Sequence, residues 1–302
     1  MEVNRSIGTL EQQYPHKLWY RLLEGLLYSS IFISCCAFGL TIETYLLAHL
    51  PVSYAMAAFV FLATLFTYNL SSLQSIIRRP GQEIDKNSPI WSQRHKKELA
   101  ILSVLSINAA VVVYFWFGLQ INLWFLLHLA VISVGYTVPI LYKQRRVKPL
   151  RSVPLLKVFL IAYVWAVVTA MFPLLDAGMQ VWQPEALWLF FRRFLFILAL
   201  ALLFDVRDYT YDRDTNTLTF PGWIGVQKTK LLSIGLLLLY VLVLIYSESG
   251  LILGALIASA AGAAIVVLFS SVERPRIYYV ILADGAMLLH AGLVMATMAW
   301  AG

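Results

Sequence analysis

Apolar runs long enough to cross a lipid bilayer recur along almost the whole chain. A helix needs about 20 apolar residues to cross the hydrocarbon core. The expected spans are 24–48, 54–77, 98–117, 121–142, 153–174, 185–206, 227–246, 250–271 and 277–300. These runs are continuous, whereas a membrane β-barrel alternates along short strands. We therefore predict an all-α integral membrane protein, with nine transmembrane helices in a single domain spanning residues 1–302.

The composition fits a chain with almost no soluble part. Hydrophobic residues make up 60% of the 302 residues and charged residues only 13%, about half the charged fraction of a soluble domain. The polar N-terminal segment lacks the pattern of a cleavable signal peptide. Cys35 and Cys36 are adjacent within one span, which favours a packing role over a disulfide. The five histidines show no metal-ligand spacing.

Basic residues gather at one set of connections. Of the 23 lysines and arginines, all but Lys157, Arg192 and Arg193 lie in the N-terminal tail or in every second connection. The positive-inside rule assigns these segments to the cytoplasm. The N-terminus is then cytoplasmic and the C-terminus outside, in what we expect to be a bacterial inner membrane. This placement argues against nucleic acid as a partner, despite the net charge of +7.

Two cytoplasmic connections are long. They span residues 78–97 and 207–226, whereas residues 1–23 form the cytoplasmic N-terminal tail. One follows the second span and the other follows the sixth, which suggests a four-helix unit used twice with a ninth helix appended. The two loops would meet on one membrane face and could form one site. The alternative is that they are solvated connectors.

The second of these loops contains a concentration of acids. The stretch FDVRDYTYDRDTNTLTFPGWIG, residues 204–225, holds Asp205, Asp208, Asp212 and Asp214. On one continuous helix the first three fall within roughly 60° of one another, and Asp214 faces away. Their mutual repulsion would be offset by a cation such as Mg²⁺, which prefers oxygen ligands, water and phosphate. Nearby arginines and lysines suit phosphate, so we expect a lipid with a phosphorylated head group.

The same stretch resembles the second aspartate-rich motif of the UbiA superfamily of intramembrane prenyltransferases, approximately D-x-R-D-x-x-x-D. VGYTVPILYKQRRVKPL resembles the connection that follows the fourth span in that family. The resemblance covers nearly the whole chain. It implies a ring of nine helices around a central cavity that opens laterally to lipid. It also implies transfer of a prenyl group from a polyprenyl diphosphate to a lipophilic, possibly aromatic, acceptor with Mg²⁺.

The first motif of the family is degenerate in this chain. It reads approximately N-D-x-x-D-x-x-x-D in the family, and residues 69–77 read NLSSLQSII. Asn69 is retained, but the aspartate positions hold Leu70, Leu73 and Ile77. Loss of these carboxylates implies one Mg²⁺ site rather than two.

These observations predict a site at the cytoplasmic end of the bundle. The expected catalytic residues are Asp208, Asp212, Asp205 and Asn69, and the expected metal ligands are Asp205, Asp208 and Asp212. The expected diphosphate-binding residues are Arg78, Arg79, Arg94, Lys143 and Arg145. The partners are a prenyl diphosphate or other lipid phosphate, a lipophilic acceptor and membrane lipid. An accessory lipid-phosphate-binding protein that has lost prenyl transfer is the alternative, and transport is a third.

Several ionisable residues lie inside the spans, where they usually mark function or pairing. At least one of Arg192 and Arg193 is expected to point inward. Lys157 could line the cavity or extend to the cytoplasmic surface, and the surface is favoured. Glu43 is expected near one end of its span, and His290 is expected to pack or to form hydrogen bonds.

Overall fold

Helices occupy each of the nine ranges that were expected to cross the membrane. The computed structural model describes residues 18–78, 95–137, 141–143, 146–148, 153, 155–215 and 217–301. The helices are α3 (Ile31–Leu47), α4 (Tyr54–Arg78), α6 (Lys96–Trp116), α7 (Leu123–Thr137), α8 (Leu156–Ala166) continued by η2 (Val167–Met171) and α9 (Phe172–Asp176), α10 (Pro184–Arg207), α13 (Val226–Ser247), α14 (Gly250–Phe269), and α15 (Arg276–Tyr278) continued by η3 (Tyr279–Ala283) and α16 (Asp284–Ala301). Among the described residues, seven of these helices are long and apolar enough to cross a membrane. Ile31–Leu47 and Leu123–Ser133 are shorter apolar helices.

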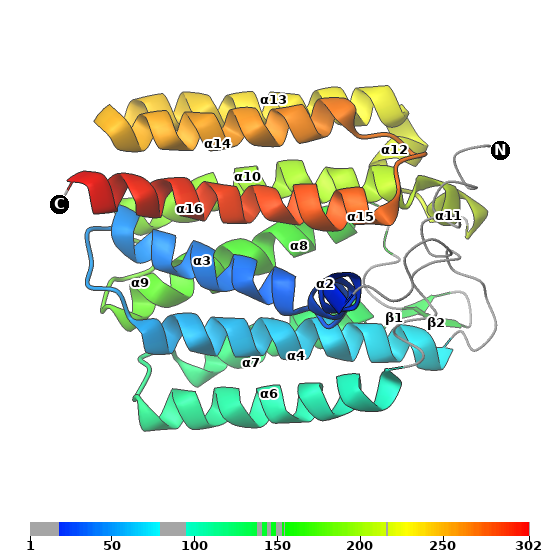
Figure 1. The fold of residues 1–302 in the computed structure, drawn as a ribbon, viewed down its shortest axis with the longest axis horizontal. Helices are drawn as coiled ribbons and strands as arrows, with labels where there is room; N and C mark the ends of the chain where they lie inside the picture. The colour runs from blue at the N-terminus through cyan, green and yellow to red at the C-terminus, as the bar shows by residue number, and fades with distance from the viewer. Residues whose placement is uncertain are drawn as a thin grey trace.

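The first expected span, 24–48, is not one helix. It is divided into α2 (Leu18–Tyr28) and α3, because Ser30 adopts a left-handed conformation with φ of 66°. Serine hydroxyls compete with helical backbone hydrogen bonds, and the Ser34 hydroxyl donates to the Ser30 carbonyl over 2.7 Å. Figure 1 shows α2 end-on, whereas the other long helices run across the view. The chain therefore enters the bundle through a helix that crosses its axis.

The fifth span contains a π-helical segment, η2, directly before Pro173. Proline has no N–H with which to close a regular helical turn, and a carbonyl left unpaired inside a bilayer is costly. The hydroxyl of Thr44 in α3 donates to the freed Thr169 carbonyl over 2.7 Å. The irregular turn is thus stabilised by a neighbouring helix.

Helix neighbours form a closed sequence of contacts. α3 packs against α4 and α16, and α4 contacts both α6 and α7. From there the contacts run through α7, α8, α10, α13 and α14 back to α16. α6 lies on the outer side of α4 (Figure 1). A ring of all nine helices around an open cavity stays a prediction.

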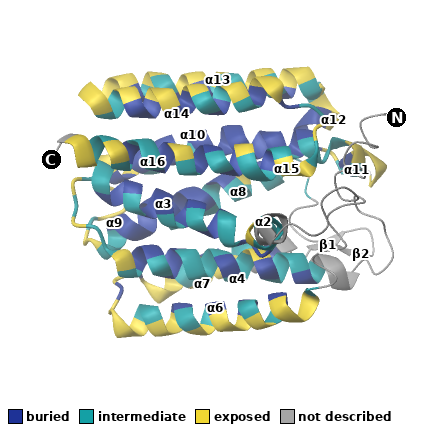
Figure 2. Cartoon of the chain, in the orientation of Figure 1, coloured by how far each residue is buried: buried dark blue, intermediate teal, exposed yellow. Residues whose placement is uncertain are grey.

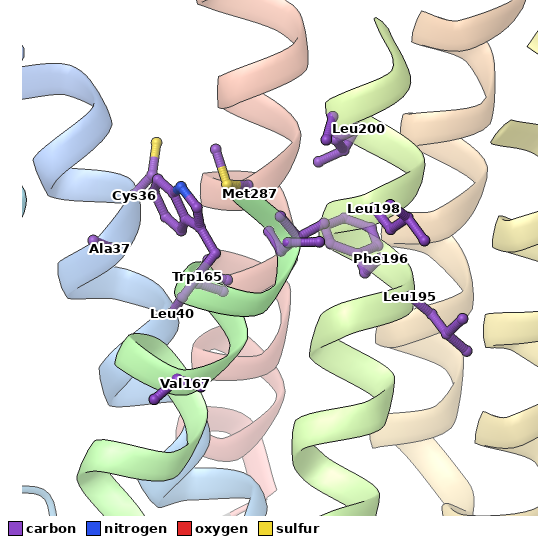
Figure 3. Packing of buried hydrophobic residues seen from close by; sticks show 14 of the residues in the cluster. Cys36, Ala37, Leu40, Trp165, Val167, Leu195, Phe196, Leu198, Leu200 and Met287 are labelled. Carbon is purple, nitrogen blue, oxygen red and sulfur yellow. The ribbon is translucent and has the colours of Figure 1, made fainter. Parts of the chain in front are cut away.

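The core lies between α3, α8, α10 and α16. Figure 3 shows Cys36, Trp165, Phe196 and Met287 from these four helices within it. α10 is the most enclosed of the spans, with buried side chains along most of its length, whereas α6, α13 and α14 expose leucine, isoleucine and valine on their outer sides (Figure 2). Apolar outer faces of this kind suit contact with lipid rather than water.

The connections that were expected to be cytoplasmic contain local structure that the sequence did not predict. β1 (Leu141–Lys143) pairs antiparallel with β2 (Arg146–Lys148), with Tyr142 opposite Val147. The expected loop 207–226 contains two short helices, α11 (Tyr209–Asp214) and α12 (Phe220–Ile224). Gly225, with φ of 87°, then starts α13, in a conformation that glycine adopts without steric cost.

Candidate functional site

The start of α8, the end of α10 and the start of α12 converge at one end of the bundle. The backbone N–H of Leu155 donates to the Leu218 carbonyl over 3.3 Å. The rings of Phe159 and Phe220 contact each other, with centroids 6.0 Å apart. The Asp205 carboxylate accepts a 3.4 Å hydrogen bond from the N–H of Phe220. Backbone and ring contacts together hold the aspartate-rich segment against the fifth span.

Lys157 joins two of the predicted aspartates. Its ammonium Nζ lies 2.9 Å from Oδ1 of Asp205, and it donates to Oδ2 of Asp212 over 2.6 Å. The Asp205 side chain is 2% exposed and that of Lys157 14% exposed, so water screens this interaction weakly. The structure thus brings Asp205 and Asp212 together around one ammonium group. The preference for a surface position of Lys157 is wrong.

Asp208 makes a separate pair. The Arg207 guanidinium donates to its two carboxylate oxygens over 2.7 and 2.9 Å. Asp208 lies between α10 and α11 and ends α10, so Asp205, Asp208 and Asp212 do not share one continuous helix. Its side chain is 38% exposed. Asp214 is 66% exposed beside Arg213, as expected for an aspartate that faces away.

Asp208 and Asp212, which lie outside the spans, differ in acidity. Burial raises the pKa of Asp208, but the Arg207 guanidinium more than offsets this and leaves the pKa below its usual value. Burial raises the pKa of Asp212, and the Lys157 ammonium only partly opposes that effect. Asp208 therefore stays ionised under more acidic conditions than Asp212 does.

The carboxylate oxygens are of the kind that Mg²⁺ prefers, but their arrangement does not fit the expected ion. Lys157 already pairs with both Asp205 and Asp212, and Arg207 pairs with Asp208. Within the described ranges, no group of three or more histidine, cysteine, aspartate or glutamate residues could hold a metal ion. A cationic ammonium stands where the sequence suggests a metal ligated by Asp205, Asp208 and Asp212.

The predicted diphosphate-binding residues cannot all be placed. Arg79, Arg94 and Arg145 lie outside the described residues, and Arg78 and Lys143 are described in their backbone alone, at the end of α4 and in β1. Their proposed role stays a prediction.

Asn69, the retained residue of the first motif, is fully buried in α4. Neither its amide nitrogen nor its amide oxygen has a hydrogen-bond partner in the described part of the chain. Its neighbour Tyr68 accepts a 3.1 Å hydrogen bond from the indole N–H of Trp165 in α8. A buried side chain with unused polar atoms is rare in folded proteins, so Asn69 is available to a polar ligand.

A second polar cluster lies deep in the bundle, away from the aspartates. Glu43 of α3 is fully buried, 3.3 Å from the Arg193 guanidinium and 2.9 Å from Nδ1 of His290. Nε2 of His290 lies 2.7 Å from the Tyr240 hydroxyl. These residues line a cavity of about 10 Å³. The expected hydrogen-bonding role of His290 is confirmed.

Both arginines of the sixth span are buried. Arg193 pairs with Glu43, and Arg192 pairs with Glu248 and donates to the Ser247 hydroxyl over 3.1 Å. The prediction that at least one of them points inward is confirmed. Glu43 lies near the C-terminal end of α3, as expected, and is fully buried among the neighbouring helices.

Lys157 and Glu43 are the two residues whose roles the sequence did not reveal. Three basic residues lie outside the segments that were expected to be cytoplasmic, and each pairs with an acid: Lys157, Arg192 and Arg193. Their departure from the positive-inside pattern is the sequence signal that could have identified them, since a charge inside a bilayer requires a partner.

Comparisons with known proteins agree with the bundle and with the position of the aspartate-rich segment. A sequence model of the UbiA prenyltransferase family matches residues 81–279. No curated protein matches the chain. A solved structure described as digeranylgeranylglyceryl phosphate synthase in membranes is similar, with 15% identity and a TM-score of 0.51. The match covers 92% of this chain and 96% of that one, and at this identity it supports the fold alone. The matched segment spans the aspartates of α10 and α11, and the chain belongs to the UbiA prenyltransferase family.

Proposed function

We propose that this multi-pass membrane protein transfers a prenyl group from a polyprenyl diphosphate to a lipophilic acceptor, with aromatic compounds among the candidates. Family membership supports intramembrane prenyl transfer. The observation that carries the proposal is the convergence of Asp205, Asp208 and Asp212 with Lys157 and Arg207 at one end of the bundle. Charged side chains of both signs at the end of an apolar bundle suit a lipid with a charged head group.

The reaction breaks the bond between the allylic carbon and diphosphate and leaves a delocalised cation. Fixed basic groups stabilise the departing diphosphate by electrostatic attraction. Arg78, Arg79, Arg94, Lys143 and Arg145 are proposed for this role because of their place in the cytoplasmic connections. Asn69 contributes a polar group from α4, where its amide is buried without a hydrogen-bond partner among the described residues.

The test uses the full chain, purified in detergent, with geranylgeranyl diphosphate and a panel of lipophilic acceptors that includes aromatic ones. Pyrophosphate release and a prenylated product are expected together. Pyrophosphate release that is no greater than that of an Asp205→Asn, Asp212→Asn double variant would contradict the proposal.

An accessory role in binding a lipid phosphate is the second candidate. The apolar residues at Leu70, Leu73 and Ile77, where the family's first motif carries aspartates, favour it. Under this alternative, geranylgeranyl diphosphate binds and is recovered unchanged with every acceptor.

The orientation is part of the proposal. The N-terminus is cytoplasmic and the C-terminus is outside, in a bacterial inner membrane. α2 and the end of α16 lie at opposite ends of the bundle (Figure 1), which supports termini on opposite sides. Accessibility of tags at the two termini tests this, and two termini on one side would contradict it. The expected single Mg²⁺, held by Asp205, Asp208 and Asp212, stays a prediction that the present pairing of these residues does not favour.

A further inference from the structure

Lys157 lies at the end of a helix where a cation is disfavoured. It is the second residue of α8, and the N-terminus of a helix carries a partial positive charge. Asp205 lies in the last turn of α10, where the partial charge is negative. Without its partner, each side chain would interact unfavourably with the dipole of its own helix. Their 2.9 Å contact removes both penalties, so the pair stabilises the junction of the two helices.

The backbone fixes the position of Lys157. Leu155 adopts a left-handed conformation with φ of 60°, which is costly for a residue other than glycine. Its N–H nevertheless donates to Leu218 in the segment that follows the aspartates. The next residue after Lys157, Val158, is 1% exposed. The lysine is thus held against the carboxylates by the packing of α8 and is not a mobile surface side chain.

The contacts of Lys157 resemble those that a cation would make. Its ammonium reaches one oxygen of Asp205 and one of Asp212, over 2.9 and 2.6 Å. A magnesium ion bridging the same two oxygens would lie about 2.1 Å from each and would place two cations in nearly the same position. Coulomb repulsion between such close charges is large where water is scarce.

We infer that the ammonium of Lys157 takes the place of a divalent cation between Asp205 and Asp212, so that the site binds a prenyl diphosphate without requiring Mg²⁺. The inference rests on the proposed function for the identity of the ligand. Lys157 and Arg207 leave the three aspartates with one net negative charge, because two cations face three carboxylates. Lys157 is a positioning residue that keeps the aspartate segment folded around the diphosphate site.

Metal binding tests the inference without a diphosphate. The probe is Mn²⁺, whose free concentration is followed by electron paramagnetic resonance during titration of the purified full chain. We expect the wild-type protein to have no Mn²⁺ site that depends on Asp212. Asp212→Asn should therefore bind as much Mn²⁺ as the wild type does. Lys157→Met, which keeps the length of the side chain without its charge, should gain one such site per chain, and Lys157→Arg should gain none. Lys230→Met is the matched control, because Lys230 donates to the backbone carbonyls of Leu268 and Ser270 instead of to a carboxylate.

Calorimetric titration with geranylgeranyl diphosphate extends the test to the ligand. The wild type should bind with affinities that differ by less than about threefold between a chelator and Mg²⁺, a difference of about 0.7 kcal/mol. Lys157→Met should bind roughly tenfold more weakly in chelator and recover when Mg²⁺ is added.

A wild-type protein that binds Mn²⁺ through Asp212, or that binds the diphosphate only with Mg²⁺, would overturn the inference. So would a folded Lys157→Met variant that gains no Mn²⁺ site. If Lys157→Met does not fold, Mn²⁺ binding by the wild type and by Asp212→Asn still shows whether the aspartates hold a metal ion in the presence of Lys157. If no protein binds geranylgeranyl diphosphate under any condition, the proposed function fails, whereas the Mn²⁺ titrations still decide the role of Lys157.

Discussion

The Glu43 carboxylate of α3 lies 2.9 Å from Nδ1 of His290 in α16, inside the bundle and out of contact with solvent. Arg193 of α10 approaches the same carboxylate to 3.3 Å. The cluster therefore joins three helices that are far apart in sequence. Removal of one member leaves charge without compensation in a medium where charge is costly.

Glu43→Gln is expected to destabilise the protein by about 3–5 kcal/mol, because Arg193 then stays buried without its counter-charge. The midpoint of thermal unfolding in detergent measures this. Glu185→Gln is the control, since Glu185 is exposed in the first turn of α10. Equal midpoints for the two variants would mean that Glu43 is neutral in the folded protein and carries no ion pair.

Asp212→Asn is expected to lower prenyl transfer at least about tenfold, or about 1.4 kcal/mol in activation free energy. The variant loses the charged hydrogen bond that fixes Lys157 and the segment around it. Asp214→Asn is the matched control, because Asp214 is exposed on the same short helix. Pyrophosphate release under saturating substrate provides the measurement. Similar losses in both variants would indicate a general effect of charge on α11.

Acidification should destabilise the protein through Asp208. Its pKa is below the usual value, since the Arg207 guanidinium more than offsets the effect of burial. A lowered folded-state pKa adds stability that is present above the unfolded pKa of about 3.9 and is lost as the pH falls through the folded pKa. Asp208→Asn should therefore show a smaller fall in unfolding midpoint between pH 5 and acidic conditions of about pH 3. Asp214→Asn should follow the wild type, and a wild-type slope for Asp208→Asn would contradict the prediction.

Gly39 and Gly254 should respond in opposite directions to alanine. A Cβ atom at Gly39 would lie 3.3 Å from the Cβ of Ala291 in α16, a short side chain that cannot rotate away. Gly39→Ala should cost about 1–3 kcal/mol of stability through overpacking. A Cβ at Gly254 meets nothing within 4 Å, so Gly254→Ala should stabilise α14 by up to about 1 kcal/mol through helix propensity. Thermal unfolding of both variants checks the two signs, and destabilisation by both would exclude the packing explanation.

The positions of the helices could be predicted from sequence because the bilayer sets the length of each apolar run. The break at Ser30 could not, since it depends on one left-handed residue inside a run that remains apolar on both sides. The short helices α11 and α12 were also missed, because the segment around them is polar and contains Pro221 and Gly225, which usually indicate a loop.

The aspartates of the candidate site could be found from their spacing, but their partners could not. Lys157 meets Asp205 only because α8 and α10 pack together with particular rotations. Sequence periodicity predicts which face of a helix is polar, and Lys157 is an isolated charge in an apolar helix. The burial of Glu43 could not be predicted for a related reason: every span is apolar, so hydropathy does not distinguish an inner helix from an outer one.

The enclosure of α3 has a consequence for how the protein matches its membrane. With 17 residues, the helix is about 26 Å long, shorter than the hydrocarbon layer of about 30 Å. None of its residues is exposed and ten of them are buried, so most of its surface faces protein instead of acyl chains. Hydrophobic mismatch acts on helices that contact lipid. Bilayer thickness therefore constrains the outer helices, such as α13 and α14, and leaves the inner helix free to be short and to contain Glu43.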